Sequence, residues 1–579
     1  MRASDLRLDA QRTLAREVGF VRKPHAGRLR VALAFPNTYF VGMSNLGFQT
    51  VYRLFNAHDD VVCERVFLPP KQALAEQLAS GVRLLTLESQ LPVHEFDVLA
   101  FSVSFEWDYT NVVTLLRLAG LAPLAAERSA RDPLVVIGGA VTFVNPEPLA
   151  PFADVIAAGE GEALVPALVD ALGAASRAEA LARLAGSRGF YLPASYDVTY
   201  GADGTIASML PIEGSPVPPI IRKAAMKAAD LVEPPHTSIF TPDTEFGSRL
   251  LIEVVRGCAN LCRFCWAGYN YLPVRAFSTA RILEIARAAG PHANRVGLVS
   301  IALCDHPDIE YLLGQLSTIG YSISPASLRL DDLTPPIVRL LRESGERTIT
   351  IAPETGSDRL RRVINKTVTN DEILDRAELI FASGFENLKL YYMIGLPSEA
   401  DEDLVAIRDL TLRMREIMLV HARRRGRIGR IVASVNPLVP KPATTFQWLP
   451  MEQSSAIDQK ARRLRRLVSD LDNVYFNIKS ERHSFYQALL SLGDRRVAPA
   501  ILEAERNGGN WRAAVAAAGL DAGFYLFRDR SRDARLPWDI IDGGLKSSFY
   551  RDELEKSTRA EWTLPPKRHR ENERWIPAS

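Results

Sequence analysis

Three cysteines in one short segment are the residues whose type and spacing most clearly favour metal chemistry. Cys258, Cys262 and Cys265 have the spacing Cys-x3-Cys-x2-Cys and follow an apolar, strand-like segment at residues 250–255. Thiolate sulfur is a soft ligand that suits iron–sulfur clusters, zinc and cuprous copper. A four-iron cluster ordinarily takes four cysteine ligands. Because no fourth cysteine is nearby in the sequence, we expect a cluster with one open iron that can bind and activate a second molecule.

A zinc site is the alternative for the same cysteines. Zinc in a structural site takes four ligands, which often include a second Cys or His pair further along the chain. Cys304 and His306 would supply that pair here. A zinc site requires neither the three-residue gap between the first two cysteines nor an aromatic residue such as Phe264. The sequence therefore favours the cluster.

The cysteine segment resembles the signature of the radical S-adenosylmethionine (SAM) enzymes. The cysteine spacing, the Arg256-Gly257 lead-in, Phe264 and the preceding strand all agree with that signature. The resemblance implies that the three cysteines hold a [4Fe-4S] cluster whose open iron chelates the amino and carboxylate groups of SAM. It also implies that an electron from the cluster cleaves SAM to a 5′-deoxyadenosyl radical, and that Phe264 lies against the SAM adenine.

A series of alternating strands and helices follows the cysteines as far as residue 436 and resembles the partial (β/α)6 barrel of the radical SAM core. In such barrels the chemistry gathers at the C-terminal ends of the strands. Arg329 is expected on the third strand, facing the SAM carboxylate, and Glu354 at the end of the fourth, facing the ribose hydroxyls or the amine. Lys389 and Tyr391 share one face of the fifth strand. A surface charge or an internal ion pair explains each of these polar residues equally well.

Two further segments bear on this resemblance. Residues 393–399 resemble the Gly-Leu-Pro-x-Glu turn of radical SAM subfamilies that act on RNA, cofactors and natural products. The Gly-Gly-Glu that holds the SAM amine in the family is missing, because residues 300–305 read Ser-Ile-Ala-Leu-Cys-Asp. Backbone carbonyls are therefore candidates for recognising the amine.

An earlier α/β series lies at residues 30–175. Its short apolar strands alternate with helical patterns, which predicts a parallel, doubly wound sheet. The strands are expected at 30–35, 61–67, 97–104, 134–137 and 154–158. In open α/β sheets, ligands bind at the carboxyl ends of the strands.

The loops at those ends resemble the cobalamin-binding domain that precedes many radical SAM cores. The resemblance rests on Gly138-Gly139, Asn145-Pro-Glu-Pro148 and Gly159-Glu-Gly-Glu162, and it makes Ser102, Gly138, Gly139 and Gly159 the expected cobalamin contacts. The first loop has no Asp-x-His-x-x-Gly, so cobalamin would have another lower ligand or none. A Rossmann-like domain that binds nothing is the alternative, because glycines at strand ends also serve turns.

Composition limits the remaining classes. A net charge of +2 over 579 residues argues against a strongly cationic nucleic-acid binder. Five cysteines, three of them in the motif, do not make a disulfide framework and indicate a reducing, cytoplasmic setting. No stretch of about 18 apolar residues occurs, so no membrane span is expected.

The predicted organisation has five parts. They are an N-terminal helix and lead-in (1–29), a cobalamin-binding-like Rossmann domain (30–175), a linker with a hairpin and a proline-rich segment (176–247), the radical SAM partial barrel (248–450) and a mostly helical C-terminal domain (451–579). The class is therefore α/β with a helical C-terminal part.

We predict a radical SAM enzyme that is associated with cobalamin and methylates an unactivated carbon. Its partners would be a reducing electron donor and a substrate that is a small molecule, a peptide or RNA. Two alternatives keep the radical chemistry: cobalamin-assisted ring closure or rearrangement, and RNA modification, for which the basic stretches at 462–466 and 567–570 are the hint. A third alternative is an RNA-binding or scaffold protein whose cluster is only structural.

Overall fold

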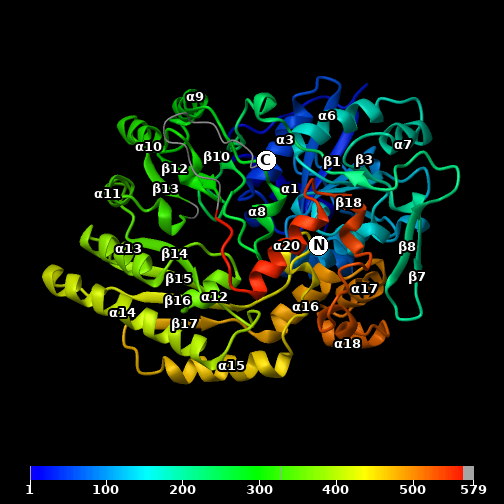
Figure 1. Ribbon diagram of the computed structural model, residues 1–579. Helices are drawn as coiled ribbons and strands as arrows, with labels where there is room; N and C mark the ends of the chain where they lie inside the picture. The colour runs from blue at the N-terminus through cyan, green and yellow to red at the C-terminus, as the bar shows by residue number, and fades with distance from the viewer. Residues whose placement is uncertain (1, 326–327, 565–579) are drawn as a thin grey trace.

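The computed structural model describes residues 2–325 and 328–564 (Figure 1). The basic stretch at 567–570 lies outside the described residues. None of the helices in the described part of the chain is long and apolar enough to cross a membrane.

The N-terminal unit is built on a six-stranded sheet. Its strands are β1 (Leu29–Phe35), β2 (Val61–Phe67), β3 (Val98–Ser102), β4 (Leu134–Gly138), β5 (Val155–Ala157) and β6 (Phe190–Tyr191). Their order is β2-β1-β3-β4-β5-β6, with the first five parallel and β6 antiparallel to β5. The predicted doubly wound sheet is confirmed. The chain adds strands toward one edge of the sheet from β1 to β2 and toward the other edge from β3 onward. The switch point therefore lies between β1 and β3, which is where such folds bind ligands.

Helices join these strands and cover the sheet. They are α1 (Ala3–Leu14), α2 (Tyr39–Gly42), α3 (Leu46–Asn56), α4 (Lys71–Ser80), α5 (Tyr109–Ala119), α6 (Gly161–Leu172) and α7 (Arg177–Ala185). Helices α3 and α6 pack on each other, whereas α5 packs against a helix of the C-terminal part, α17 (Ala498–Arg506).

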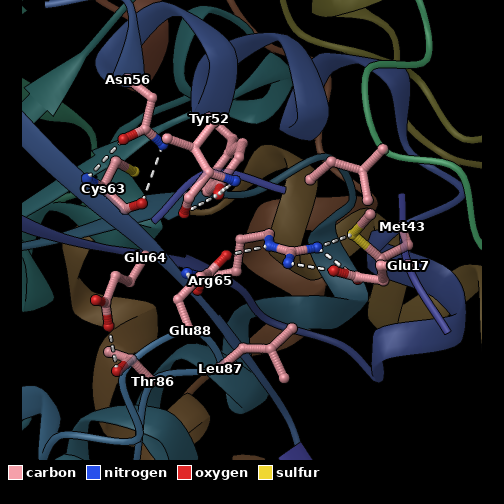
Figure 2. A network of polar contacts seen from close by, with 12 residues as sticks. Glu17, Met43, Tyr52, Asn56, Cys63, Glu64, Arg65, Thr86, Leu87 and Glu88 are labelled. Carbon is pink, nitrogen blue, oxygen red and sulfur yellow. Dashed lines mark hydrogen bonds and ion pairs between the residues drawn. The ribbon is translucent and has the colours of Figure 1, made fainter. Parts of the chain in front are cut away.

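A buried arginine fastens the segment after α1 to this sheet. The side chain of Arg65 on β2 is fully buried, and its guanidinium lies 2.6 Å from a carboxylate oxygen of Glu17 and 2.6 Å from one of Glu88 (Figure 2). It also lies 5.1 Å from the centre of the Tyr52 ring. Because a buried charge is costly without partners, these contacts fix the edge strand and the N-terminal segment together.

The second unit contains two four-stranded sheets. The first has β10 (Leu250–Arg256), β12 (Arg295–Ser300) and β13 (Ser322–Pro325) in parallel, with β11 (Arg275–Ala276) antiparallel to β10. The second has β14 (Thr348–Glu354), β15 (Asn387–Ile394), β16 (Ile431–Pro437) and β17 (Val474–Ile478), all parallel. Within the described ranges, β13 and β14 belong to different sheets and no closed barrel forms.

Helices lie between these strands, as the alternating pattern predicts. They are α8 (Trp266–Asn270), α9 (Thr279–Ala289), α10 (Ile309–Thr318), α11 (Pro335–Glu343), α12 (Asp358–Val363), α13 (Asn370–Ala382) and α14 (Asp401–Arg425). On β15, Leu388, Leu390 and Tyr392 are fully buried, whereas Lys389 and Tyr391 between them are half-buried. One face of the strand therefore packs in the core and the other is left for polar side chains.

The segment between the units contains the predicted hairpin. It is formed by β7 (Tyr196–Tyr200) and β8 (Ile206–Pro211), and a later strand, β9 (Ile221–Arg222), pairs with β18 (Ile541–Asp542) from near the C-terminus. The C-terminal part is mostly helical, but β17 extends the second sheet. Its helices are α15 (Ser454–Leu467), α16 (Glu481–Leu492), α17, α18 (Trp511–Ala517), α19 (Ala522–Leu526) and α20 (Ser547–Thr558).

Candidate cluster site and adjoining cavity

The three cysteines lie in the loop between β10 and α8, at the carboxyl end of β10. Cys258 is buried and the other two are half-buried. Burial raises the pKa of all three thiols, and that of Cys262 to about 12. In the described part of the chain, no group of three or more His, Cys, Asp or Glu side chains is placed to hold a single metal ion. Three thiols in one loop fit a four-iron cluster, in which each cysteine binds a different iron.

A second loop and the C-terminal helix hold the cluster loop in place. The backbone amide of Arg263 donates to the Ile364 carbonyl at 2.9 Å, and its fully buried guanidinium donates to the Arg362 carbonyl at 2.7 Å. The same guanidinium lies 3.1 Å from Glu553 on α20. Asn365 donates to the carbonyls of Asn260 and Leu261, both at 3.2 Å. The cluster loop is thus fixed on the side that faces the loop after α12.

Phe264 and Arg329 were both predicted to contact SAM, and the structure shows where each of them lies. Phe264 is half-buried and packs against the core that the N-terminal and C-terminal parts share. Its contact with SAM adenine stays a prediction. Arg329 does not lie on a strand, because β13 ends at Pro325 and Arg329 precedes a 3-10 turn, Leu330–Asp332. The expectation that it points from the third strand is therefore wrong.

The Arg329 guanidinium is held by carboxylates. It lies 2.8 Å from Asp305 and 3.0 Å from Asp332, and its Nη1 lies 3.9 Å from the Cys258 sulfur. Asp305 and Asp332 already accept from the Arg329 guanidinium. The SAM carboxylate could pair with Arg329 only by sharing N–H donors with these two residues. The structure places Arg329 as a cation beside the first cysteine.

The two residues of the zinc alternative are engaged elsewhere. The Asp308 amide donates to Nδ1 of His306 at 3.2 Å, and Nε2 of His306 lies 2.9 Å from the Phe277 carbonyl. Backbone groups thus occupy both ring nitrogens. The sulfur of Cys304 lies 3.4 Å from the Asp332 carbonyl.

Glu354 is the last residue of β14 and has a left-handed backbone, with φ of +65°. Such a conformation is uncommon for a residue other than glycine and is often found at functional sites. Its carboxylate lies 3.2 Å from the ammonium of Lys366. Burial raises the pKa of Glu354, and Lys366 partly opposes that rise.

Lys366 is a candidate residue that the sequence did not single out. It lies in the loop between α12 and α13, directly after Asn365. Burial lowers its pKa, but Glu354 and the Cys262 and Cys265 thiolates outweigh burial and raise the pKa to about 12. Lys366 is thus a charged group beside two of the three cysteines. No sequence motif marks it, because its position depends on two loops that meet only in the fold.

Lys389 and Tyr391 lie on one face of β15, as the spacing predicts. The Lys389 ammonium lies 5.1 Å from the centre of the Tyr391 ring. β15 pairs with β14, whose Glu354 is opposite Tyr392, and with β16, whose Ser434 is opposite Tyr391. The two side chains therefore stand next to the strand that ends at Glu354. Their contact with SAM remains a prediction.

A cavity of about 520 Å³ lies between the two α/β units. All four residues predicted to contact cobalamin line it: Ser102, Gly138, Gly139 and Gly159. One wall is apolar and comes from the N-terminal unit, with Leu33, Phe55, Val136 and Leu164. The facing wall comes from β10, β12 and the cluster segment, with Glu253, Arg256, Tyr271 and Ser300. Ligand sites commonly combine such an apolar wall with a few placed polar groups.

The glycines at this edge serve different purposes. A side chain on Gly139, whose φ is +100°, would place its Cβ 2.3 Å from the Val103 carbonyl oxygen. On Gly159, with φ of +145°, the Cβ would lie 2.1 Å from the Ala224 carbonyl oxygen. A Cβ on Gly138 would meet nothing closer than 3.7 Å. Backbone packing requires Gly139 and Gly159, whereas a Cβ on Gly138 would make only ordinary van der Waals contacts at the cavity wall.

An ion-pair network joins the two units at the edge of the cavity. Arg256 lies 2.7 Å from Glu253, 2.8 Å from Glu162 and 3.3 Å from Glu160, and Arg275 lies 2.5 Å from Glu160. Glu160 and Glu162 come from the loop that sequence resemblance assigned to cobalamin binding. In the structure both glutamates pair with Arg256, the last residue of β10, which lies two residues before Cys258.

The basic C-terminal stretch forms one face of a helix. Arg462, Arg465 and Arg466 are exposed on α15, whose Ile457 and Leu464 are buried in the core. This is the pattern of an amphipathic helix with a solvated polar face.

Comparison with known proteins assigns both units to one superfamily. A family model described as radical SAM superfamily matches residues 252–411, and one described as radical SAM proteins, N-terminal, matches residues 47–193. Together with the three cysteines at the end of β10, these matches identify the chain as a member of the radical SAM superfamily. A [4Fe-4S] cluster and SAM are the cofactors that this membership implies.

Individual relatives are distant. The uncharacterized protein MJ0966 of Methanocaldococcus jannaschii is 25% identical over 472 residues, which are 81% of this chain and 89% of that protein. The radical SAM methyltransferase TsrM from Kitasatospora setae, solved with tryptophan and a SAM analog, is 12% identical with a TM-score of 0.45, over 70% of this chain and 72% of that one. The cobalamin-dependent SAM radical enzyme OxsB, solved with aqua-cobalamin, is 14% identical with a TM-score of 0.43, over 66% of this chain and 52% of that one. The chain thus spans about half the length of OxsB in that comparison.

Proposed function

We propose that this radical SAM enzyme binds cobalamin and its substrate in the cavity between the two α/β units, and that it methylates an unactivated carbon. The observation that carries the proposal is the position of the cavity. It lies at the carboxyl edge of a parallel sheet, where such sheets bind ligands, and its opposite wall is β10, which leads directly into the cluster loop.

The lining of the cavity supports a large, mostly apolar ligand with polar edges. Leu33, Phe55 and Leu164 offer an apolar surface, and Gly138 leaves room for close approach to the backbone. No histidine is among the described residues that line the cavity. Cobalamin in this site would be held by the apolar wall and by the glycines at the sheet edge.

The polar wall would position the substrate. When bound, the cluster supplies the electron that cleaves SAM, and cobalamin supplies a carrier for the methyl group. Arg256 holds Glu253 and Glu162 against the cavity, and Tyr271 lies among these charges. These ion pairs fix the polar side chains along the wall of the cavity. A low-potential electron donor is the required partner.

Anaerobic purification of the full chain with iron, sulfide and hydroxocobalamin tests the proposal. We expect about four irons per chain, a bound-cobalamin spectrum, and formation of 5′-deoxyadenosine from SAM. A holoprotein that cleaves SAM but takes up no cobalamin would contradict the cobalamin part. Mass analysis of the products then separates a methylated product from a ring-closed or rearranged one.

A substitution that fills the cavity sharpens this test. Gly138→Leu adds a side chain at the cavity wall, where a Cβ meets nothing closer than 3.7 Å, so cobalamin uptake should fall at least tenfold while iron content and SAM cleavage persist. Gly314→Leu is the control, because a Cβ on Gly314 meets nothing within 4 Å and Gly314 lies on α10, outside the cavity lining. Equal cobalamin uptake by both variants would place cobalamin elsewhere.

A further inference from the structure

We infer that Lys366 is the counter-charge of the cluster and that the Lys366–Glu354 pair sets how easily the cluster is reduced. The inference rests on the cluster part of the proposed function and does not depend on cobalamin. In this inference Lys366 affects SAM cleavage indirectly, because its charge changes how easily the cluster is reduced.

The fold holds Lys366 next to the cysteines. Asn365, with φ of +53°, donates to the carbonyls of Asn260 and Leu261 inside the cluster loop. The backbone amide of Lys366 donates to the Arg361 carbonyl at 2.8 Å. The residue before the lysine and the lysine's own backbone are thus fixed, and its side chain, only 18% exposed, meets the Glu354 carboxylate at 3.2 Å.

The loop that carries Lys366 lies against the segment that carries the cluster ligands. Leu261, whose carbonyl accepts from Asn365, directly precedes Cys262, and the Arg263 amide, directly after Cys262, donates to the Ile364 carbonyl. Arg329, the cation beside Cys258, pairs with Asp305 and Asp332, whereas Lys366 pairs with Glu354. Charges separated from water interact strongly, so an ammonium here stabilises added negative charge on the cluster.

Reduction of the cluster is the step that this charge affects. When bound, the cluster would accept one electron from a low-potential one-electron donor, with no proton taken up, and would pass that electron to SAM. The Lys366 ammonium would favour this electron uptake, and the Glu354 carboxylate would oppose it.

Redox titration of the reconstituted full chain, followed by electron paramagnetic resonance, tests the inference. Lys366→Met should make reduction about tenfold less favourable, which is about 59 mV for a one-electron couple. Glu354→Gln should shift the equilibrium in the opposite direction, and the double variant should lie between the two. Lys460→Met is the matched control, because Lys460 is also 18% exposed and paired with glutamates, Glu399 and Glu452.

The outcomes separate the possible failures. A wild-type chain that assembles no four-iron cluster overturns the proposed function itself. Loaded Lys366→Met protein with the wild-type potential overturns only the inference about Lys366. If Lys366→Met does not take up iron, Lys366→Arg and Glu354→Gln still decide: the arginine should keep the wild-type potential, and an unshifted potential in Glu354→Gln contradicts the inference.

Discussion

Replacement of Arg263 should loosen the cluster loop more than it unfolds the protein. Arg263 stands between Cys262 and Phe264 in the sequence of the cluster loop, and its side chain is fully buried. It donates to the carbonyls of Arg362, Val363 and Glu561 at 2.7, 3.1 and 2.9 Å, and it pairs with Glu553 at 3.1 Å. Removing one partner of a buried ion pair costs about 3–5 kcal/mol. In the variant, Glu553 still pairs with Lys556 at 2.9 Å. We therefore expect Arg263→Met to lower the free energy of unfolding by about 3 kcal/mol, the lower end of that range.

The assay combines urea unfolding, followed by circular dichroism, with iron content per folded chain. Arg263→Met should lower the unfolding midpoint and also lose most of its iron. Arg65→Met is the matched control, because Arg65 is equally buried and pairs with Glu17 and Glu88, yet it lies in the N-terminal sheet (Figure 2). It should lower the midpoint by a similar amount and keep its iron. Equal iron in both variants would refute the reasoning that Arg263 fixes the cluster loop.

Three further predictions address single sites. Gly139→Ala should destabilise the protein by about 1–3 kcal/mol in urea unfolding, because the added Cβ clashes with the Val103 backbone. Gly138→Ala should change stability by less than about 0.5 kcal/mol. Equal effects of the two substitutions would contradict the packing argument. Burial raises the pKa of Asp108 from 3.8 to about 6, so the folded state binds more protons than the unfolded state between these values. Stability should therefore fall as pH rises through that window, and Asp108→Asn should raise the unfolding midpoint at pH 8 but not at pH 4; a gain independent of pH would contradict this. Cys265→Ala should retain far fewer than about four irons per chain while its far-ultraviolet circular dichroism stays unchanged, and full iron content would rule out Cys265 as a ligand.

Local pattern predicted the sheets well but not the turns between them. The expected strand at 61–67 coincides with β2, because its residues are almost all buried and are bounded by Asp60 and the proline pair after Leu68. The expected third strand of the second unit runs too far, since β13 ends at Pro325. Proline cannot donate to a strand ladder, and this signal was present in the sequence. Arg329 consequently lies in a turn, where Asp305 and Asp332 hold it.

The cluster part of the site was predictable because one segment contains it. The three cysteines are close in sequence, so their spacing alone indicated a cluster. Lys366 and Arg263 depend on contacts between residues about 100 positions apart, such as that of Arg263 with Val363, and no spacing rule reveals these. The glycines at the sheet edge show the opposite problem. Gly138 and Gly139 look alike in sequence, and only the backbone around them separates the open position from the packed one.

One strand connects the cavity with the cluster. Glu253 and Arg256 on β10 line the cavity, and Cys258 follows Arg256 by two residues. At a rise of about 3.3 Å per residue, two residues span about 7 Å. A substrate held at the polar wall would therefore lie near the loop that carries the cluster. The pairing of Arg256 with Glu160 and Glu162 ties the N-terminal sheet to the same point. The distance between a ligand on that sheet and the cluster is thus fixed by ion pairs, and not by the long segment that joins the units in sequence.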